Sequence, residues 1–552
     1  MGDTVTGPVG VVLSAPQLVF VCVQYYETFM AYINQKKELS TYCAFFLVQH
    51  KQFQYWISRA MPDGKTLLTD DVTKQDLTMA LLDQTREAFE DAQKFTQWYG
   101  KRSLFDWFSR KQELKASIQD VSMTRRLAWA LEGSKSAEKL LVLLERSNKA
   151  LQLVWNMSSD SFQRQLLPEL DDFNSLSGLR LIEGALKREE SKEYCGILTA
   201  VRLRRACLEE MHAERNHSND LVGARTRDNL ELRLTDFKNP EIFFADKLPK
   251  VTTTVNGDQV LLECKRYEYE KSARMPTQSR FNETVAAGIT RLAHDLAKPM
   301  KPWKLKTLDC VGFIKLSWDR TRWPGHVLAF KLPANVHAEP VSLRRVINDT
   351  SNTCGLPLGH RFTLALGLTN AVYSLLSVGW LHKGIRSRSI LFFKPRDAPP
   401  TENWLPSPKD FFLMGFESSR PIDVMYLSGR LEAVELEDKF YVYPKYFHDC
   451  TMGYKPGFDL FSLGMVLVEI ALWRTSENLM QDVSEQERAL PKDQKEIVAN
   501  FLIPMVERTV GVVYADCVRL CINGEFCDQD ELRKLLMAFD KQVIANLEKC
   551  YA

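Results

Sequence analysis

The sequence has almost no charge imbalance and lacks the repeats that mark several common classes of protein. Its 72 lysine and arginine residues nearly balance its 70 aspartate and glutamate residues, which leaves a net charge of +2. No overall electrostatic field favours nucleic acid, and we expect no nucleic-acid partner. The 552 residues contain no internal repeat and no long low-complexity tract, and 45% of them are hydrophobic. Such a chain is large enough for about two to four globular domains.

The twelve cysteines include no CxxC pair and are scattered from Cys22 to Cys550. They lack the regular clustering of a secreted domain held by disulfides, so a reducing compartment fits best and we expect a cytoplasmic protein. Cys517, Cys521 and Cys527 form a cluster, but no histidine lies near them in the sequence. We therefore interpret them as small buried apolar residues and predict no metal site.

One long stretch without charge lies at the start of the sequence. Between Asp3 and Glu27 there are 23 uncharged residues, which is about the length that crosses a bilayer as a helix. No basic region precedes the stretch, which argues against a cleaved signal peptide. Pro8, Gly10 and Pro16 make it a poor permanent span, so a helix buried in a bundle is the simpler interpretation. A segment that inserts into membranes is the alternative.

Hydrophobic periodicity divides the chain into an all-α part and a mixed part. Up to about Thr235, apolar residues return at intervals of three and four, which predicts long amphipathic helices packed as a bundle. Beyond it, short β-rich runs appear, with a hairpin turn at Asn256, Gly257 and Asp258, and helices follow. We predict a multidomain protein with a helical bundle over residues 1–215, a linker or brace over 216–239, and an α+β domain over 240–552.

The mixed part resembles a protein kinase domain, because five landmarks occur in the order of that family. They are "VLLECK" with Lys265 as the lysine that pairs nucleotide phosphates, "LHKGIRSRSIL" with His382 in the catalytic loop, "LMGFESSR" with Phe416 in the DFG segment, "YPKY" around Pro444, and "GFDLFSLGMVLVEI" with Asp459. The resemblance implies a bilobal α+β fold. In that fold His382 packs within the larger lobe, and Asp459 holds the backbone of the catalytic loop through hydrogen bonds.

The residues that carry the chemistry of that family are missing. Gly384 replaces the catalytic aspartate, whereas Ser389 and Gly415 replace the asparagine and the aspartate that bind magnesium. The motif GxGxxG, which covers the phosphates, is absent between Asp236 and Lys265. Loss of a general base alone slows a reaction by roughly 10²–10⁴-fold, and loss of electrostatic stabilisation costs more. We therefore expect a pseudokinase with no catalytic residue rather than an enzyme.

ATP is the one cofactor that the resemblance raises. It assigns Lys265 as the phosphate contact, whereas a pair between Lys265 and a carboxylate such as Glu283 needs no nucleotide. We favour the second interpretation and predict no cofactor. By the same resemblance, Ser418, Ser419 and Tyr426 lie where a regulatory phosphate would be added.

The helical part is similar to the HeLo domain of fungal heterokaryon-incompatibility and prion-forming proteins. The matching pieces are the apolar start "GPVGVVLSAPQLVFVCVQYYETFMAYI", the helix "FFLVQHKQFQYW" and the segment "RRLAWALEGSKSAEKLLVLLERSNKALQLVW". The resemblance implies a bundle whose N-terminal segment leaves its packed position, inserts into a membrane and kills the cell. The sequence has no C-terminal amyloid motif, so prion-like templating is not expected.

A HeLo-like bundle joined to a pseudokinase is similar in plan to the mixed-lineage-kinase-domain-like family, in which the pseudokinase restrains the bundle until a signal releases it. The resemblance implies fungal programmed cell death, protein partners, self-association through the bundle, contact with membrane lipid, and movement from the cytoplasm to the plasma membrane. Two alternatives stay open. One is a soluble scaffold that binds only proteins. The other is an atypical kinase in which Asp410 and Glu417, near the "GFE" segment, supply the acid–base group and the metal contact.

Overall fold

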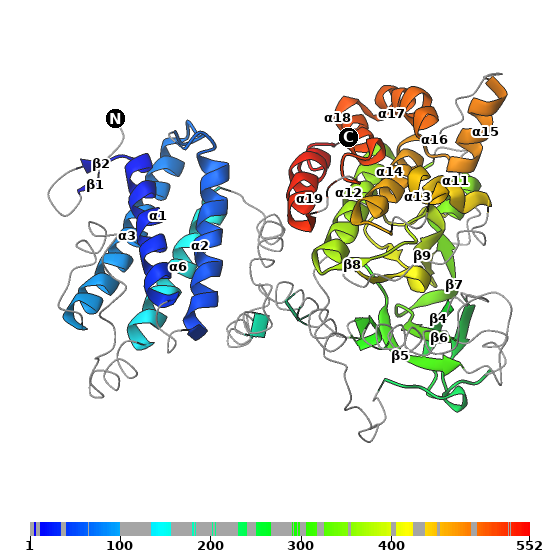
Figure 1. Cartoon of the computed structure of the whole chain (residues 1–552), viewed down its shortest axis with the longest axis horizontal. Coiled ribbons are helices and arrows are strands. Elements are labelled where there is room, and N and C mark those ends of the chain that lie inside the picture. The colour runs from blue at the N-terminus through cyan, green and yellow to red at the C-terminus, as the bar shows by residue number, and fades with distance from the viewer. Residues whose placement is uncertain are drawn as a thin grey trace. The chain divides into compact units, whose positions relative to one another are not determined.

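We describe the fold from a computed structural model of the chain. The residues that it describes are 5–6, 12–34, 40–64, 66–99, 134–155, 179–180, 183, 201–202, 205, 230–239, 250–266, 290, 292–294, 296–297, 305–316, 325–350, 355–398, 404–422, 436–449, 453–486, 494–527, 529 and 531–551. The chain divides into two compact units, Met1–Val201 and Arg202–Ala552. Its N-terminal helices are followed by antiparallel sheets and further helices, a multidomain α+β arrangement (Figure 1). Residues 216–229 of the predicted linker lie outside the described residues.

Long helices build the described part of the first unit. They are α1 (Ala15–Asn34), α2 (Ser40–Ala60), α3 (Val72–Tyr99) and α6 (Ser134–Val154). The helix α1 packs against α2 and α3, and α6 packs against the same two helices (Figure 1). Aromatic rings from three helices meet in the interior, where the ring of Tyr26 lies 5.5 Å from Phe46 and 4.8 Å from Phe89 between centroids. These helices lie where apolar residues at intervals of three and four predict amphipathic faces.

The uncharged N-terminal stretch does not form one helix. Val5–Thr6 (β1) pairs antiparallel with Val12–Leu13 (β2), and α1 begins only at Ala15. In the part of the chain that the structure describes, no single helix is both long and apolar enough to cross a membrane. A bent pair of helices, Pro456–Leu472 and Ser476–Asp482, meets that test by length and composition.

The second unit contains a four-stranded sheet. Its strands are β3 (Lys250–Thr253), β4 (Gln259–Arg266), β5 (Asp309–Leu316) and β6 (Gly325–Lys331). They lie in the order β3-β4-β6-β5, and every neighbouring pair is antiparallel. The predicted turn at Asn256, Gly257 and Asp258 joins β3 to β4, which confirms the hairpin. Gly257 has a φ of 94°, a backbone conformation that glycine adopts without strain.

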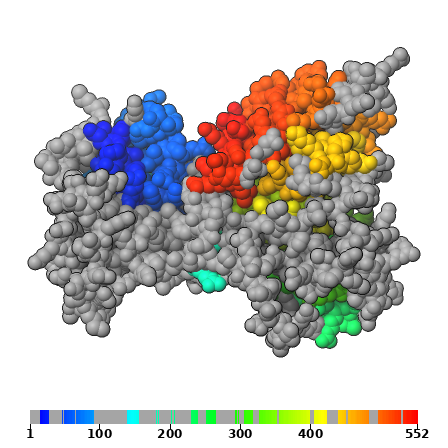
Figure 2. Space-filling view, in the orientation of Figure 1, coloured from blue at the N-terminus to red at the C-terminus, as the bar shows by residue number. Residues whose placement is uncertain are grey.

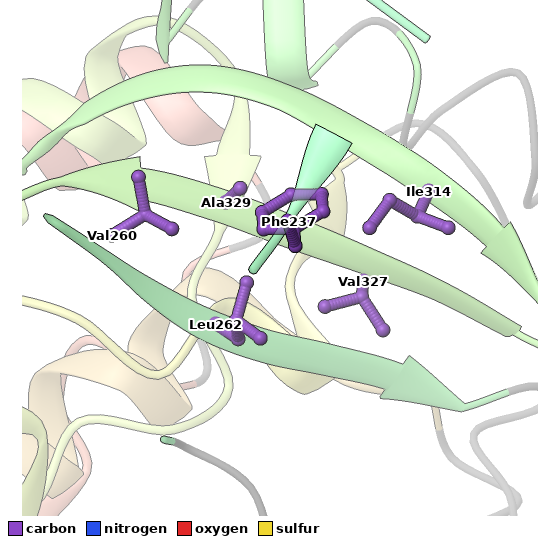
Figure 3. Close-up of a cluster of buried hydrophobic side chains, with 6 residues drawn as sticks. All are labelled: Phe237, Val260, Leu262, Ile314, Val327 and Ala329. Atoms are coloured by element: carbon purple, nitrogen blue, oxygen red, sulfur yellow. The ribbon is translucent and has the colours of Figure 1, made fainter. Parts of the chain in front are cut away.

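One face of this sheet carries a hydrophobic cluster (Figure 3). Its members come from three strands and a preceding segment: Phe237, Val260, Leu262, Ile314, Val327 and Ala329. Because side chains alternate along a strand, Leu261 and Glu263 of β4 lie on the opposite face. Phe330 of β6 belongs to that opposite face too, and its ring centroid lies 6.4 Å from that of Phe416. The second face of the sheet therefore holds a carboxylate beside aromatic rings.

Smaller sheets and a helical region complete the described part of the second unit. β7 (Val336–Ser342), β9 (Ile390–Pro395) and β10 (Phe412–Leu413) form one sheet in the order β10-β9-β7, and β8 (Trp380–Leu381) pairs with β11 (Arg420–Pro421). The helices are α11 (Leu343–Thr350), α12 (Leu358–Ser377), α13 (Pro444–His448), α14 (Pro456–Leu472), α15 (Ser476–Gln486), α16 (Gln494–Ile497), α17 (Ile503–Val510), α18 (Val512–Asn523), α19 (Leu532–Phe539) and α20 (Ala545–Leu547). In the space-filling view the C-terminal helices, coloured orange to red, form one continuous surface (Figure 2).

The helix α14 lies at the centre of this helical region. Every residue from Gly457 to Ala471 is buried, and the helix packs against α12, α17 and α18. Its sequence is apolar nearly all round, which predicts a helix surrounded by protein. Asp459 lies in the first turn of α14 and is 0% exposed. A helix with an apolar surface therefore holds a single aspartate in the interior, next to the loop that follows β8.

Candidate functional site

The buried carboxylate of Asp459 holds the loop that follows β8. It accepts hydrogen bonds from the backbone N–H of His382 at 2.7 Å and of Lys383 at 2.8 Å. The hydroxyl of Tyr454 donates a third hydrogen bond to it at 2.8 Å. Burial raises the pKa of Asp459 to about 6, and these hydrogen bonds work against that rise. The contacts confirm the prediction that Asp459 binds the backbone of this loop.

The loop closes on itself around Gly384 and Ser389. The hydroxyl of Ser389 donates to the carbonyl oxygen of Gly384 at 2.7 Å and accepts from the N–H of Arg386 at 3.1 Å. A Cβ atom built on Gly384 would lie 2.9 Å from the carbonyl oxygen of Gly415, a distance that side chains essentially never adopt. The backbone of Gly415 thus occupies the space that a side chain at residue 384 needs.

The segment after β10 forms a tight turn against this loop. Gly415 has a φ of 94°, in the left-handed region, and a Cβ atom there would lie 3.0 Å from the Cβ atom of Ser389. The buried ring of Phe416 lies 4.9 Å from the ring of His382 between centroids. His382 is 0% exposed, and its Nδ1 accepts the N–H of Gly384 at 3.2 Å. These contacts agree with the packing role predicted for His382.

A carboxylate from the sheet completes the site. The side chain of Glu263 in β4 accepts the N–H of Gly415 at 2.8 Å and the N–H of Phe416 at 3.0 Å. Glu263 is 6% exposed, and burial raises its pKa to about 7 although the two N–H bonds lower it. Glu417 adds to the rise, and Arg386 opposes it. Three segments that are distant in the sequence therefore meet: strand β4, the loop after β8 and the turn after β10.

Arginines of the loop bind two acidic residues. Arg386 forms ion pairs with Glu417 at 2.5 Å and with Asp438 at 2.7 Å, and Arg388 pairs with Asp438 at 2.6 Å. Asp438 is buried, whereas Glu417 is exposed at the surface. Arg386 therefore joins the exposed Glu417 to the buried Asp438.

A buried chain of hydrogen bonds continues from the same loop. The hydroxyls of Ser387 and Tyr441 lie 2.9 Å apart, and Tyr441 donates to Glu469 of α14 at 2.7 Å. Glu469 also accepts the N–H of Ser476 at 2.6 Å. The 3-10 helix that contains Tyr441, Leu436–Tyr441, is thus attached both to the loop and to the central helix. Sequence reasoning did not identify this chain or Glu263, although a glutamate inside the apolar run "VLLECK" is a visible signal.

The structure places the remaining predicted residues separately. Lys265 lies in β4 with its backbone opposite His326, and its side chain, like Glu283 and Tyr426, lies outside the described residues. Asp410 is exposed at the surface. Within the described ranges, no group of three or more histidine, cysteine, aspartate or glutamate residues is arranged to hold a metal ion.

The two serines that were predicted to receive a phosphate differ in how exposed they are. Ser418 is exposed, and it follows the Glu417 that pairs with Arg386. Ser419 is 1% exposed, and its hydroxyl donates to the carbonyl oxygen of Phe416 at 2.8 Å. In this conformation the hydroxyl of Ser419 is not accessible to a modifying enzyme, because it is buried and hydrogen-bonded to Phe416. The prediction for Ser418 fits this conformation better than the prediction for Ser419 does.

A layer of polar side chains lies in the interior of the first unit. Nδ2 of Asn148 in α6 lies 2.9 Å from the backbone oxygen of Gln49 and 3.3 Å from the hydroxyl of Tyr26. His50 stacks on Tyr26 with ring centroids 5.2 Å apart. Within the described helices, Nε2 of His50, Oδ1 of Asn148 and Nε2 of Gln152 are buried without a hydrogen-bond partner. Each such atom costs about 1–3 kcal/mol, so the layer weakens the packing between α1, α2 and α6.

Comparison with known proteins adds no assignment. A scan of the sequence against models of protein families finds no match, and a search of curated proteins finds no significant match. The function is therefore argued from the two sites described above.

Proposed function

We propose that the second unit is a protein-kinase-like domain that does not catalyse phosphoryl transfer, and that it restrains a HeLo-like bundle that acts on membranes when released. In this proposal the protein is a signalling component of fungal programmed cell death, not an enzyme. It works in the cytoplasm and moves to the plasma membrane on activation. Its partners are proteins, further copies of its own bundle and membrane lipid.

The arrangement of the second unit supports the kinase-like part of the proposal. The strand that contains Lys265 lies between its hairpin partner β3 and β6, in a small antiparallel sheet that precedes the helical region. Asp459 of the central helix α14 accepts a hydrogen bond from the backbone N–H of His382, which fixes the loop that contains His382. The turn around Phe416 packs against that loop. This arrangement supports the assignment of the kinase landmarks in the sequence.

The observation that carries the non-catalytic part is the contact between Gly384 and Gly415. Phosphoryl transfer needs an acid–base group near the substrate hydroxyl and carboxylates that hold magnesium. Both positions are glycines here. The backbone of Gly415 occupies the space that a side chain at residue 384 needs, and Ser389 limits the space at residue 415. Ser389, at the third position, uses its hydroxyl to bind Gly384 within the loop. These positions therefore offer no carboxylate to hold the magnesium ions that contact the phosphates of ATP.

The atypical-kinase alternative receives no support from the geometry. Its two residues were Asp410 and Glu417. Asp410 lies at the surface before β10, and the carboxylate of Glu417 is paired with Arg386. Arg386 lies 2.5 Å from Oε1 of Glu417, which disfavours a metal contact through that oxygen. A non-catalytic domain is therefore the better supported interpretation.

Two features of the first unit support its action on membranes. The first is the lack of charge in α1 before Glu27, which lowers the cost of entering lipid. Phe20 of α1 is 62% exposed, although phenylalanine is seldom so accessible in a folded protein. The second feature is the polar layer. His50 of α2 and Asn148 of α6 both contact Tyr26 of α1, and each has a buried atom without a hydrogen-bond partner, which lowers the stability of this packing.

Dye release from liposomes of phosphatidylcholine and phosphatidylserine tests the proposal. We expect the fragment 1–215, checked for helical content by circular dichroism, to release dye, and the full chain to release much less. Phe20→Asp places a charge on the exposed side of α1 and should abolish release by the fragment. Leu68→Asp is the matched control, because Leu68 is 61% exposed but lies outside the helices.

The outcome separates the proposal from the scaffold alternative. If the folded fragment releases no dye, or if Phe20→Asp and Leu68→Asp behave alike, the membrane part of the proposal falls. The second unit would then be a soluble scaffold for protein partners. Transfer of radiolabelled phosphate from magnesium–ATP to a generic substrate tests the non-catalytic part separately, and we expect none above the background of a heated sample.

A further inference from the structure

We propose that Glu263 is an internal ligand that locks the four-stranded sheet to the Gly415–Phe416 turn, in the role that a bound nucleotide plays between the corresponding segments of an active kinase. We call this contact the Glu263 clasp: the carboxylate of Glu263 with the N–H groups of Gly415 and Phe416. The comparison with a nucleotide rests on the proposed function. The clasp itself rests only on the contacts of these three residues.

The position of Glu263 in its strand gives the first argument. In an active kinase the lysine strand and the DFG segment are connected through nucleotide phosphates and magnesium ions. Here Glu263 lies two residues before Lys265 in β4. The side chain of Glu263 reaches the turn directly, and no phosphate or metal is needed to connect the two segments.

The geometry of the clasp gives the second argument. Each carboxylate oxygen accepts one N–H: Oε1 from Gly415 at 2.8 Å, and Oε2 from Phe416 at 3.0 Å. Two successive N–H groups point to one acceptor group because Gly415 has a φ of 94°. When the carboxylate of Glu263 is ionised, each of these hydrogen bonds is stronger than one to a neutral acceptor. An alanine or aspartate at residue 415 would strain this turn, so glycine at that position serves the clasp as well as removing a metal ligand.

Aromatic packing holds the same two segments together. The ring of Phe416 lies 6.4 Å from the ring of Phe330 in β6, and both rings are buried. Leu328, also in β6, lies opposite Glu263 in the strand register and is 1% exposed. Glu263 is itself only 6% exposed, so water has little access to its oxygens. An enclosed carboxylate that satisfies both N–H groups fixes one arrangement of the sheet and the turn.

Hydrogen–deuterium exchange of the full-length chain tests the clasp. Glu263→Ala removes both acceptors, so we expect the amides of Gly415 and Phe416 to exchange roughly tenfold faster or more, which corresponds to about 1.4 kcal/mol. The amides of His382 and Lys383, which Asp459 holds, should keep their wild-type rates and report that the unit is folded. Glu339→Gln is the control variant, because its side chain is 80% exposed and lies on another strand.

A second variant keeps the test decisive if Glu263→Ala does not fold. Glu263→Gln preserves the volume of the side chain and one accepting oxygen, so we expect faster exchange at one of the two amides and a smaller change at the other. Wild-type exchange at both Gly415 and Phe416 in a folded variant would overturn the clasp. Such a result would leave the proposed function untouched, because dye release and phosphate transfer are measured separately.

Magnesium–ATP provides the remaining arm of the experiment. The wild-type chain should show the same exchange at Gly415 and Phe416, and the same melting temperature, with and without the nucleotide. Slower exchange of these amides with magnesium–ATP would overturn the inference that Glu263 takes the place of a nucleotide. Turnover of that ATP would contradict the proposed function instead, and the two failures are therefore distinguishable.

Discussion

Gly384 and Gly415 lie so close together that a Cβ atom on Gly384 would be 2.9 Å from the carbonyl oxygen of Gly415. The absence of side chains at these two positions is thus a packing requirement, and in the proposed function it also removes catalytic and metal-binding groups. Ser389 belongs to the same unit, because its hydroxyl binds Gly384 and its Cβ atom limits the space at Gly415. A single substitution does not convert such a site into an active one.

We expect Gly384→Asp, which restores the aspartate of the kinase motif, to lower the free energy of unfolding by about 1–3 kcal/mol, because the new side chain overpacks the contact with Gly415. Phosphate transfer should stay at background, because the metal ligand at residue 415 is still missing. Urea denaturation and a radiolabelled phosphate assay measure the two effects. Gly384→Ala, which adds only the Cβ atom, should show part of the same destabilisation. Unchanged stability in both variants would contradict the proposed contact.

The helices and the hairpin were accessible from the sequence, whereas the contacts of the site were not. Periodicity and the turn at Asn256 and Gly257 depend on neighbours in the chain, which a single sequence displays. The partner of Glu263 is more than a hundred residues away, and only the register of the folded strands brings Gly415 to it. Asp438 lies 52 residues after Arg386 in the sequence, and only the folded structure shows that the two residues pair.

In the uncharged N-terminal stretch, composition alone does not predict where the helix begins. Its length and lack of charge fit one long helix, but α1 begins only at Ala15, after two short strands. Pro8 and Gly10 in that stretch are poor helix formers, and this local signal predicts the interruption better than the overall hydrophobicity does. The role of Asp459 was predicted from the kinase resemblance, and it agrees with the rule that a buried carboxylate needs hydrogen bonds inside the protein.

Asp459→Asn should destabilise the second unit. The substitution replaces a carboxylate by an amide, which cannot accept the N–H groups of His382 and Lys383 with both of its atoms. We expect a loss of about 2–4 kcal/mol in urea denaturation and faster amide exchange at the two residues. Asp349→Asn is the control, because Asp349 is 55% exposed and faces Arg345 at the surface. Its effect should stay below about 0.5 kcal/mol. Equal effects of the two substitutions would refute the structural role of Asp459.

The pKa of Glu263 predicts how stability changes with pH. Burial raises this pKa from 4.5 to about 7, so between these values the folded chain binds a proton that the unfolded chain does not. The contribution of Glu263 to the free energy of unfolding is therefore complete below the unfolded pKa and falls as the pH rises through 7. We expect the stability difference between wild type and Glu263→Gln to decrease by about 1–3 kcal/mol from about pH 5 to about pH 8. A difference that is constant over this range would show that the carboxylate has an ordinary pKa.

His50 offers a test of the polar layer in the bundle. Burial lowers the pKa of His50 to about 4, so the ring is neutral near neutral pH and its Nε2 lies buried without a partner. His50→Phe keeps an aromatic ring against Tyr26 and removes the unpartnered atom, and we expect it to stabilise the bundle by about 1–2 kcal/mol. Because the folded pKa lies below the unfolded one, wild-type stability should fall as the pH is lowered from about 6.5 to about 4, and the variant should lose this part of the slope.

Thermal denaturation of the fragment 1–215 at several pH values measures both effects of His50→Phe. The proposed function adds an independent expectation, since a bundle that is harder to open should release less dye from liposomes at the same protein concentration. Ser58→Ala serves as a control, because the hydroxyl of Ser58 binds only the carbonyl oxygen of Tyr55 within the same helix α2. If His50→Phe stabilises the fragment and leaves dye release unchanged, the polar layer affects folding but does not govern the release of α1.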